Sequence, residues 1–111
     1  MINKMFRSLK HSISGLQFAY NIDKTIKLEF ILTLPVIILI FIFFEDTEIY
    51  VLILLWFFII IVELINTVIE KTIDSISKDE SIIIKKIKDI SSAAVFLSVM
   101  IFLLSFIYFL L

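Results

Sequence analysis

Three long apolar runs dominate the pattern of hydrophobic and polar positions along the chain. They cover residues 28–44, 49–69 and 90–111. Each falls within the range of about 17 to 25 residues that an α-helix needs to cross a bilayer. The third run is the clearest, because it contains no Asp, Glu, Lys, Arg or His. The pattern therefore predicts three transmembrane helices.

The N-terminal segment, residues 1–24, has a different pattern. Apolar side chains recur at steps of three and four residues over residues 3–21, and basic and polar side chains lie mostly off that stripe. This pattern is typical of an amphipathic helix that lies in the membrane interface. A surface helix of a soluble domain has the same pattern, but the apolar runs that follow favour the interface.

Composition supports a membrane protein and excludes several other classes. Hydrophobic residues make up 61% of the 111 residues and the mean hydropathy is +1.13, whereas soluble domains are usually about 45–50% apolar. The absence of cysteine excludes a disulfide framework and a thiolate metal site. A single glycine excludes the glycine-rich phosphate loops of P-loop and protein-kinase type. We predict one all-α membrane domain over residues 1–111, with no nucleic-acid partner.

All ten Lys and Arg residues lie on one side of the predicted spans. Five precede the first apolar run and five lie between the second and third, whereas the turn between the first two carries Glu45, Asp46 and Glu48 and no basic residue. Cytoplasmic loops of membrane proteins are enriched in Lys and Arg. We therefore expect the N-terminus and the second loop to be cytoplasmic and the C-terminus to lie outside.

The second predicted helix carries a polar stripe in apolar surroundings. Glu63 follows fourteen apolar residues, and Asn66, Glu70 and Asp74 follow it at steps of three, four and four. At about 100° per residue these four side chains lie within about 80° of one another. A carboxyl group at such depth is costly, so it usually faces the protein interior or a water-filled cavity and marks a functional site.

The stripe and the cytoplasmic lysines together could supply what phosphoryl transfer requires: a metal site, a base and positive charge near the phosphates. Clustered carboxylates repel one another unless a cation or a proton lies among them, and Mg²⁺ typically binds one or two carboxylates together with substrate phosphates. A deeply buried carboxylate could accept the proton of an alcohol, and the cytoplasmic lysines could neutralise phosphates. From the residues alone, two further interpretations stay open: a polar stripe that joins helices, or a proton or ion pathway.

The stripe belongs to a longer motif that resembles a known family. Residues 63–74 read E-L-I-N-T-V-I-E-K-T-I-D, similar to the signature E-x-x-N-[ST]-x-[IV]-E-x-x-x-D of the prokaryotic diacylglycerol kinase family. Residues 88–95, K-D-I-S-S-A-A-V, resemble the family's K-D-x-x-S-A-A-V at the start of the third helix. Gly15, Asp23 and the run that ends at Glu29 also fit. The resemblance therefore covers nearly the whole chain.

The resemblance implies a homotrimer of three-span subunits in the bacterial cytoplasmic membrane, with ATP as co-substrate and Mg²⁺ as cofactor. It implies that Glu63 is the general base and that Asp23 and Glu70 bind the metal. The nucleotide contacts that it implies are Lys4, His11, Asp79, Lys88 and Asp89. The positions that match lipid-binding or supporting residues are Asn66, Asp74, Ser92 and Glu29.

The chain also departs from the family pattern. Asp23 stands where the family usually has Glu, Ser91 stands where glycine is common, and the second loop, with Asp79, lacks the family's histidine. These changes bear on metal and nucleotide affinity more than on the type of reaction.

The resemblance also implies a lipid substrate. Glu29 and the S-S-A-A run at residues 91–94 resemble the diacylglycerol type of the family more than the undecaprenol type, which implies diacylglycerol as substrate and phosphatidic acid as product. Undecaprenol is the alternative substrate. A non-enzymatic small membrane channel or assembly subunit is the further alternative.

Overall fold

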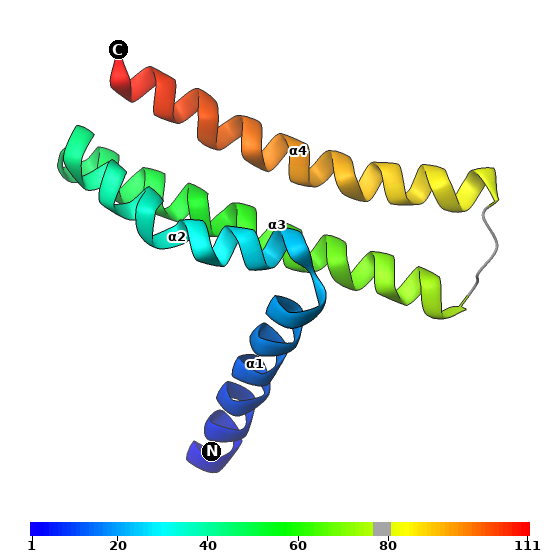
Figure 1. Cartoon of the computed structure of the whole chain (residues 1–111). Coiled ribbons are helices and arrows are strands. Elements are labelled where there is room, and N and C mark those ends of the chain that lie inside the picture. The colour runs from blue at the N-terminus through cyan, green and yellow to red at the C-terminus, as the bar shows by residue number, and fades with distance from the viewer. Residues whose placement is uncertain (77–80) are drawn as a thin grey trace.

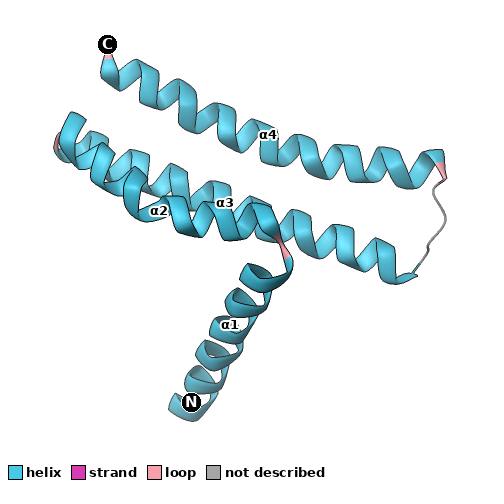
Figure 2. Ribbon diagram, in the orientation of Figure 1, coloured by secondary structure: helices cyan, strands magenta, loops and turns pink. Residues whose placement is uncertain are grey.

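The computed structural model describes residues 1–76 and 81–111, which form four α-helices and no strand (Figures 1 and 2). The helices are α1 (Ile2–Ile22), α2 (Lys24–Phe43), α3 (Asp46–Ile76) and α4 (Ile82–Leu110). The last three are long and apolar enough to cross a membrane. The structure therefore confirms the all-α class and the three helices of spanning length.

Helix α3 connects the other parts of the molecule. It packs along both α2 and α4, whereas α1 packs against α2. Figure 1 shows the turn between α2 and α3 at the same end of the bundle as the C-terminus, and α1 leaving the other helices at a steep angle. The N-terminus therefore lies well away from the three apolar helices.

Side-chain caps set the points at which α2 and α4 begin. Oδ1 of Asp23 accepts hydrogen bonds from the backbone N–H groups of Thr25 (2.8 Å) and Ile26 (3.1 Å). Oγ of Ser81 accepts one from the N–H of Ile84 (3.2 Å). Such caps stabilise a helix because the N–H groups of its first turn have no partner within the helix.

The helices extend beyond the predicted spans. Helix α2 begins at Lys24 rather than at residue 28, α3 continues to Ile76, and α4 begins at Ile82 rather than near residue 90. Residues 70–76 and 82–89, which were predicted to lie in a loop, are therefore helical. Polar residues mark where a helix leaves the apolar layer, but they do not end it, because helical hydrogen bonds are made within the backbone.

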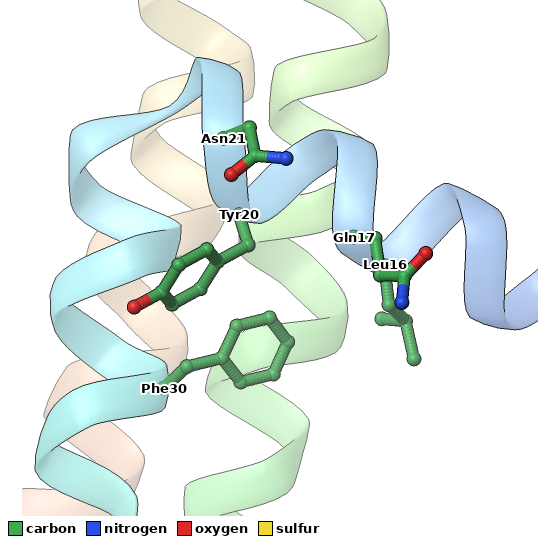
Figure 3. A pocket seen from close by; sticks show the side chains of 5 residues that line it. All are labelled: Leu16, Gln17, Tyr20, Asn21 and Phe30. Carbon is green, nitrogen blue, oxygen red and sulfur yellow. The ribbon is translucent and has the colours of Figure 1, made fainter.

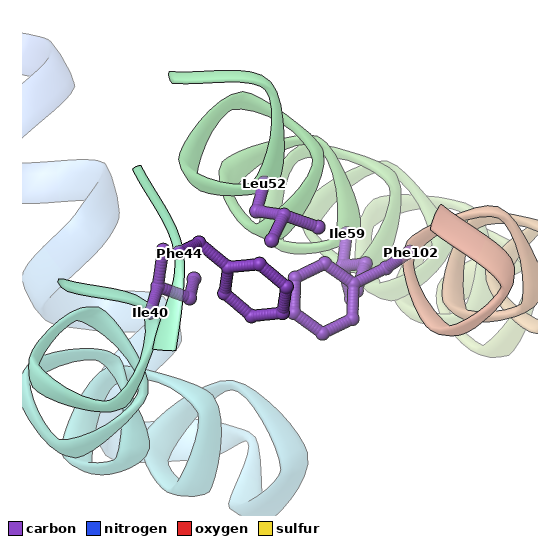
Figure 4. Close-up of a cluster of buried hydrophobic side chains, with 5 residues drawn as sticks. All are labelled: Ile40, Phe44, Leu52, Ile59 and Phe102. Carbon is purple, nitrogen blue, oxygen red and sulfur yellow. The ribbon is translucent and has the colours of Figure 1, made fainter. Parts of the chain in front are cut away.

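An apolar cluster fills the end of the bundle near the turn between α2 and α3 (Figure 4). Its buried members are Ile40, Phe44, Leu52, Ile59 and Phe102. The rings of Phe44 and Phe106 meet edge to face, with centroids 5.0 Å apart. Because lipid tails are as apolar as these side chains, the cluster stabilises the bundle through close packing and not through removal of apolar surface from water.

Polar contacts between helices add to this packing. Nε1 of Trp56 in α3 donates to Oγ1 of Thr33 in α2 at 3.0 Å, and such bonds hold helices together in lipid. The outer surfaces of α2 and α4 are mostly uncovered, since only 11% of the most apolar window of each helix is buried within the chain. These surfaces are available to lipid or to further copies of the chain.

Candidate active site

The polar stripe of α3 faces the protein interior. Glu63 and Asn66 are only 6% and 7% exposed, Glu70 is half-buried, and Asp74 is exposed. By contrast, Ile65 on the same helix is 55% exposed. The stripe therefore runs from the inside of the bundle to its polar surface, as the sequence predicts.

The start of α2 brings Asp23 to this stripe. Thr67 lies on α3 between Glu63 and Glu70, and its buried hydroxyl donates to Oδ2 of Asp23 at 2.8 Å. Oδ1 of Asp23 accepts the two N–H bonds that cap α2. These bonds hold the side chain in one orientation against α3, and Oδ2, which accepts a single bond, keeps one lone pair for another partner.

Four carboxyl groups gather where α2 begins. Glu63 lies within electrostatic range of Asp23 and Glu70, and Glu29 lies within range of Glu63 and Asp23. Oε1 of Glu29 is buried and accepts no hydrogen bond from the described residues. Since like charges at such separations repel, the cluster favours a cation or a proton among its members.

The donor set of this cluster suits a hard cation that keeps other ligands. Carboxylate oxygens are the ligands that Mg²⁺ prefers. Within residues 1–76 and 81–111, no three His, Asp or Glu side chains converge as a complete metal site. Asp23 and Glu70 could hold Mg²⁺ together with water and nucleotide phosphates, because Mg²⁺ commonly takes only one or two carboxylates from the protein.

Helix α4 contributes to the site through Ser91. Its buried hydroxyl donates to Oδ1 of Asn66, and Nδ2 of Asn66 donates to Oε1 of Glu70 at 3.1 Å. The family resemblance assigns no role to Ser91 and implies instead that Ser92 lies near the lipid. Ser92 is exposed in the chain, and its role stays a prediction.

Two ion pairs lie at the outer end of the stripe. Nζ of Lys88 in α4 donates to Oδ1 of Asp74 in α3 at 2.6 Å. Nζ of Lys85 donates to Oδ2 of Asp89 one turn along α4 at 2.8 Å. The second pair is exposed, so we expect it to contribute little stability. The first pair joins α3 to α4 and keeps a lysine beside the carboxyl stripe.

The family model described as prokaryotic diacylglycerol kinase matches residues 10–110. The chain belongs to the prokaryotic diacylglycerol kinase family. The match covers the stripe of α3 and the start of α4, and it confirms the resemblance seen in residues 63–74. No curated protein matches the chain.

The nucleotide-binding residues that the diacylglycerol kinase family predicts for this chain lie apart within one copy of it. Lys4 and His11 are exposed on α1, whose free end points away from α4 (Figure 1). Lys88, by contrast, contacts Asp74 of the stripe from α4, and Asp89 follows it on the same helix. Asp79 lies outside the described residues. The separation of α1 from α4 means that one chain does not bring the two groups of residues together.

The corner between α1 and α2 is formed by aromatic packing. The rings of Tyr20 and Phe30 lie with centroids 6.1 Å apart, and Nζ of Lys27 lies 5.6 Å from the centroid of the Tyr20 ring. Figure 3 shows both rings among the side chains that line a shallow pocket. The volume of this pocket is about 420 Å³. The other residues that line it are Leu16, Gln17 and Asn21. These contacts set the direction in which α1 leaves the bundle.

A larger, mostly apolar groove of about 590 Å³ lies between α1 and α3. Thr67, which donates to Asp23, forms part of its wall, so the groove adjoins the carboxyl cluster. Its volume is typical of small-molecule sites, which are about 300–1,000 Å³. The residues that line it are Ser12, Gly15, Leu16, Phe18, Ala19, Ile22, Leu64, Thr67, Val68, Lys71 and Thr72.

Proposed function

We propose that the chain is an ATP- and Mg²⁺-dependent lipid kinase. It transfers the γ-phosphate of ATP to the hydroxyl of diacylglycerol, giving phosphatidic acid and ADP. The observation that carries this proposal is the carboxyl stripe of α3, which runs from the buried Glu63 to the surface and meets Asp23 at one side and Lys88 at its outer end. Membership of the diacylglycerol kinase family supports a kinase over a channel or assembly subunit.

Glu63 is the proposed general base. It accepts the hydroxyl proton of the lipid as the hydroxyl oxygen attacks the γ-phosphorus, and the bond from that phosphorus to the β,γ-bridging oxygen breaks to release ADP. The burial of Glu63 supports this role, because a site that excludes bulk water prevents transfer of the phosphoryl group to water.

The charge of ATP is neutralised from two sides in this proposal. Asp23 and Glu70 would hold Mg²⁺, which would supply positive charge to the phosphate oxygens. Lys88 contacts the phosphates from α4, and its bond to Asp74 keeps it beside the stripe before ATP binds. Asp89 contacts the nucleotide from the next position of the same helix.

The groove between α1 and α3 is the proposed binding site for an acyl chain of the lipid. It is lined mostly by apolar side chains and adjoins the carboxyl cluster through Thr67. A lipid held there by an acyl chain would present its headgroup hydroxyl toward Glu63. Ser92 and Glu29 remain proposed supporting residues on the lipid side, and Asn66 supports Glu70 through its hydrogen bond.

The active form is proposed to be a homotrimer in the bacterial cytoplasmic membrane, with α1 in the cytoplasmic interface. The uncovered apolar surfaces of α2 and α4 support association with further copies. The distance between α1 and α4 within one chain also supports it, because a neighbouring copy could bring its own Lys4 and His11 to Lys88 and Asp89. Asp79 completes the proposed nucleotide contacts.

Cysteine labelling tests the proposed orientation, since the chain has no cysteine of its own. Thr47→Cys lies in the first turn of α3, beside the connection to α2, and Ser75→Cys lies at the far end of α3; both positions are exposed. A membrane-impermeant maleimide added to spheroplasts should label Thr47→Cys and should label Ser75→Cys only after the cells are opened. The reverse pattern would contradict a cytoplasmic carboxyl stripe.

The proposed substrate is tested by offering diacylglycerol and undecaprenol together in mixed micelles with ATP and Mg²⁺. We expect phosphatidic acid to be the main product, and both products can be separated by thin-layer chromatography. Undecaprenyl phosphate as the main product would support the alternative substrate and contradict the assignment to diacylglycerol. No phosphorylated lipid of either kind, from protein that is folded and oligomeric, would overturn the lipid kinase proposal.

A further inference from the structure

Ser91 carries a buried hydroxyl for which the proposed chemistry has no use. It is 9% exposed on α4, and it donates to Oδ1 of Asn66 on α3. The other buried serine of α4, Ser98, donates instead to the backbone carbonyl of Val95 in its own helix at 2.6 Å. The hydroxyl of Ser91 therefore forms a hydrogen bond between helices, to the polar stripe of α3, and not one within α4.

We propose that Ser91 is a positioning residue that sets the orientation of Glu70 through Asn66. It acts across the interface between α3 and α4 and prepares one carboxylate of the cation site. The proposal rests on the proposed function only for the identity of the cation as Mg²⁺. The hydrogen-bonded chain Ser91–Asn66–Glu70 stands on the geometry of the molecule itself.

The direction of each hydrogen bond determines the next. An asparagine side chain has an acceptor end and a donor end. The Ser91 hydroxyl occupies the acceptor end of Asn66, so the donor end faces Glu70, whose carboxylate can only accept. Oε1 of Glu70 is thereby held at 3.1 Å from Nδ2. No hydrogen bond from the described residues reaches the second oxygen, Oε2, which therefore keeps its lone pairs for a cation.

Removal of the Ser91 hydroxyl would leave the acceptor end of Asn66 buried without a donor. A buried acceptor without a partner is unfavourable, so the amide is expected to turn toward another donor and to loosen its bond to Glu70. Groups that hold a metal ligand in place commonly alter metal affinity without touching the metal. Ser91 is therefore expected to affect the binding of Mg²⁺ more than the folding of the chain.

The asparagine side chain provides a direct measurement. The chain has only three asparagines, Asn3, Asn21 and Asn66, so selective ¹⁵N-asparagine labelling of the full chain in nanodiscs gives three side-chain amide pairs. Loss of one pair in Asn66→Ala identifies the signal of Asn66. MgCl₂ alone, without nucleotide, is then added, and the midpoint of the change in that signal reports the affinity for Mg²⁺.

Ser91→Ala is compared with Ser98→Ala, which removes the same atom from a buried site on the same helix. Ser91→Ala is expected to shift the Asn66 amide signal and to raise the Mg²⁺ midpoint about fivefold, the effect of one lost hydrogen bond. Ser98→Ala should change neither, and Ser91→Thr, which keeps the hydroxyl, should restore the midpoint to within about twofold of the unaltered chain.

Equal effects of Ser91→Ala and Ser98→Ala would overturn the proposal. A shifted Asn66 signal with an unchanged Mg²⁺ midpoint would also overturn it, because the contact would then be structural only. The lipid assay separates this inference from the proposed function. If the unaltered chain phosphorylates no lipid but Ser91→Ala still raises the Mg²⁺ midpoint, the kinase assignment fails and the positioning role stands.

Discussion

Replacement of Glu63 by glutamine is expected to lower the rate of lipid phosphorylation by about 10³-fold, because general-base catalysis contributes about 10² to 10⁴. The amide keeps the size of the side chain but cannot accept a proton from the lipid hydroxyl. Since Glu63 is buried among other carboxyl groups, removal of its charge should not destabilise the bundle. The initial rate with saturating ATP, Mg²⁺ and diacylglycerol measures the effect.

The matched control is Glu45→Gln, which makes the same change in the exposed turn between α2 and α3. It should keep the rate of the unaltered chain. Size-exclusion chromatography and thermal unfolding in the same detergent check that Glu63→Gln remains folded and oligomeric. A Glu63→Gln variant with a near-normal rate would show that Glu63 is not the base.

Replacement of Glu70 by glutamine is expected to give the second-largest loss, about 10²-fold in rate at the Mg²⁺ concentration that half-saturates the unaltered chain, as is typical when a charge-stabilising group is removed. Glutamine offers a single neutral oxygen to the cation. If that oxygen faces the cation, the amide hydrogens face Nδ2 of Asn66, which now donates to Glu70; if it accepts from Nδ2, the amide nitrogen faces the cation. Higher Mg²⁺ should recover part of the rate, because the loss lies partly in metal affinity.

Glu48→Gln provides the control for Glu70, since it changes another carboxyl of α3 far from the stripe. Its dependence on Mg²⁺ should match that of the unaltered chain. The measurement is the rate as a function of Mg²⁺ at fixed ATP for all three proteins. If Glu70→Gln lost rate with no change in Mg²⁺ dependence, the assignment of Glu70 to the metal would be wrong.

The three long helices and the inward direction of the stripe were predictable from the sequence. Apolar runs of spanning length indicate membrane helices in a chain of this size, because a small soluble core could not bury three of them. The inward direction of Glu63 followed from the cost of a carboxyl group in lipid, and the spacing of Asn66 and Glu70 placed them on the same face. Each of these features is determined by the sequence of a single helix and does not depend on how that helix packs against its neighbours.

The contacts between helices were not predictable, because they depend on how each helix is rotated against its neighbours. Ser91 and Ser92 differ by about 100° around α4, and only the packing of α4 on α3 decides which of them meets Asn66. The bond from Thr67 to Asp23 joins residues 44 positions apart. The [ST] position of the family motif indicated that the hydroxyl of Thr67 has a role, but the sequence did not identify Asp23 as its hydrogen-bond partner.

The boundaries of the polar segment were missed for a different reason. Ser81 stands directly before a run of isoleucines, which is a start signal for a helix, and it caps α4 in the structure. The many charged residues of the stretch 70–89 obscured that signal. A polar helix that projects from the membrane has the composition of a loop, so hydropathy alone does not distinguish the two.

The central claim is that the carboxyl stripe serves transfer of the terminal phosphate of ATP to a lipid. The most direct measurement is the transfer of ³²P to lipid by the purified chain in mixed micelles with diacylglycerol and Mg²⁺. The ATP carries ³²P at either the γ or the α position. We predict labelled phosphatidic acid from γ-labelled ATP, none from α-labelled ATP, and none when Mg²⁺ is chelated. Folded protein that leaves the lipid unlabelled with γ-labelled ATP would contradict the claim.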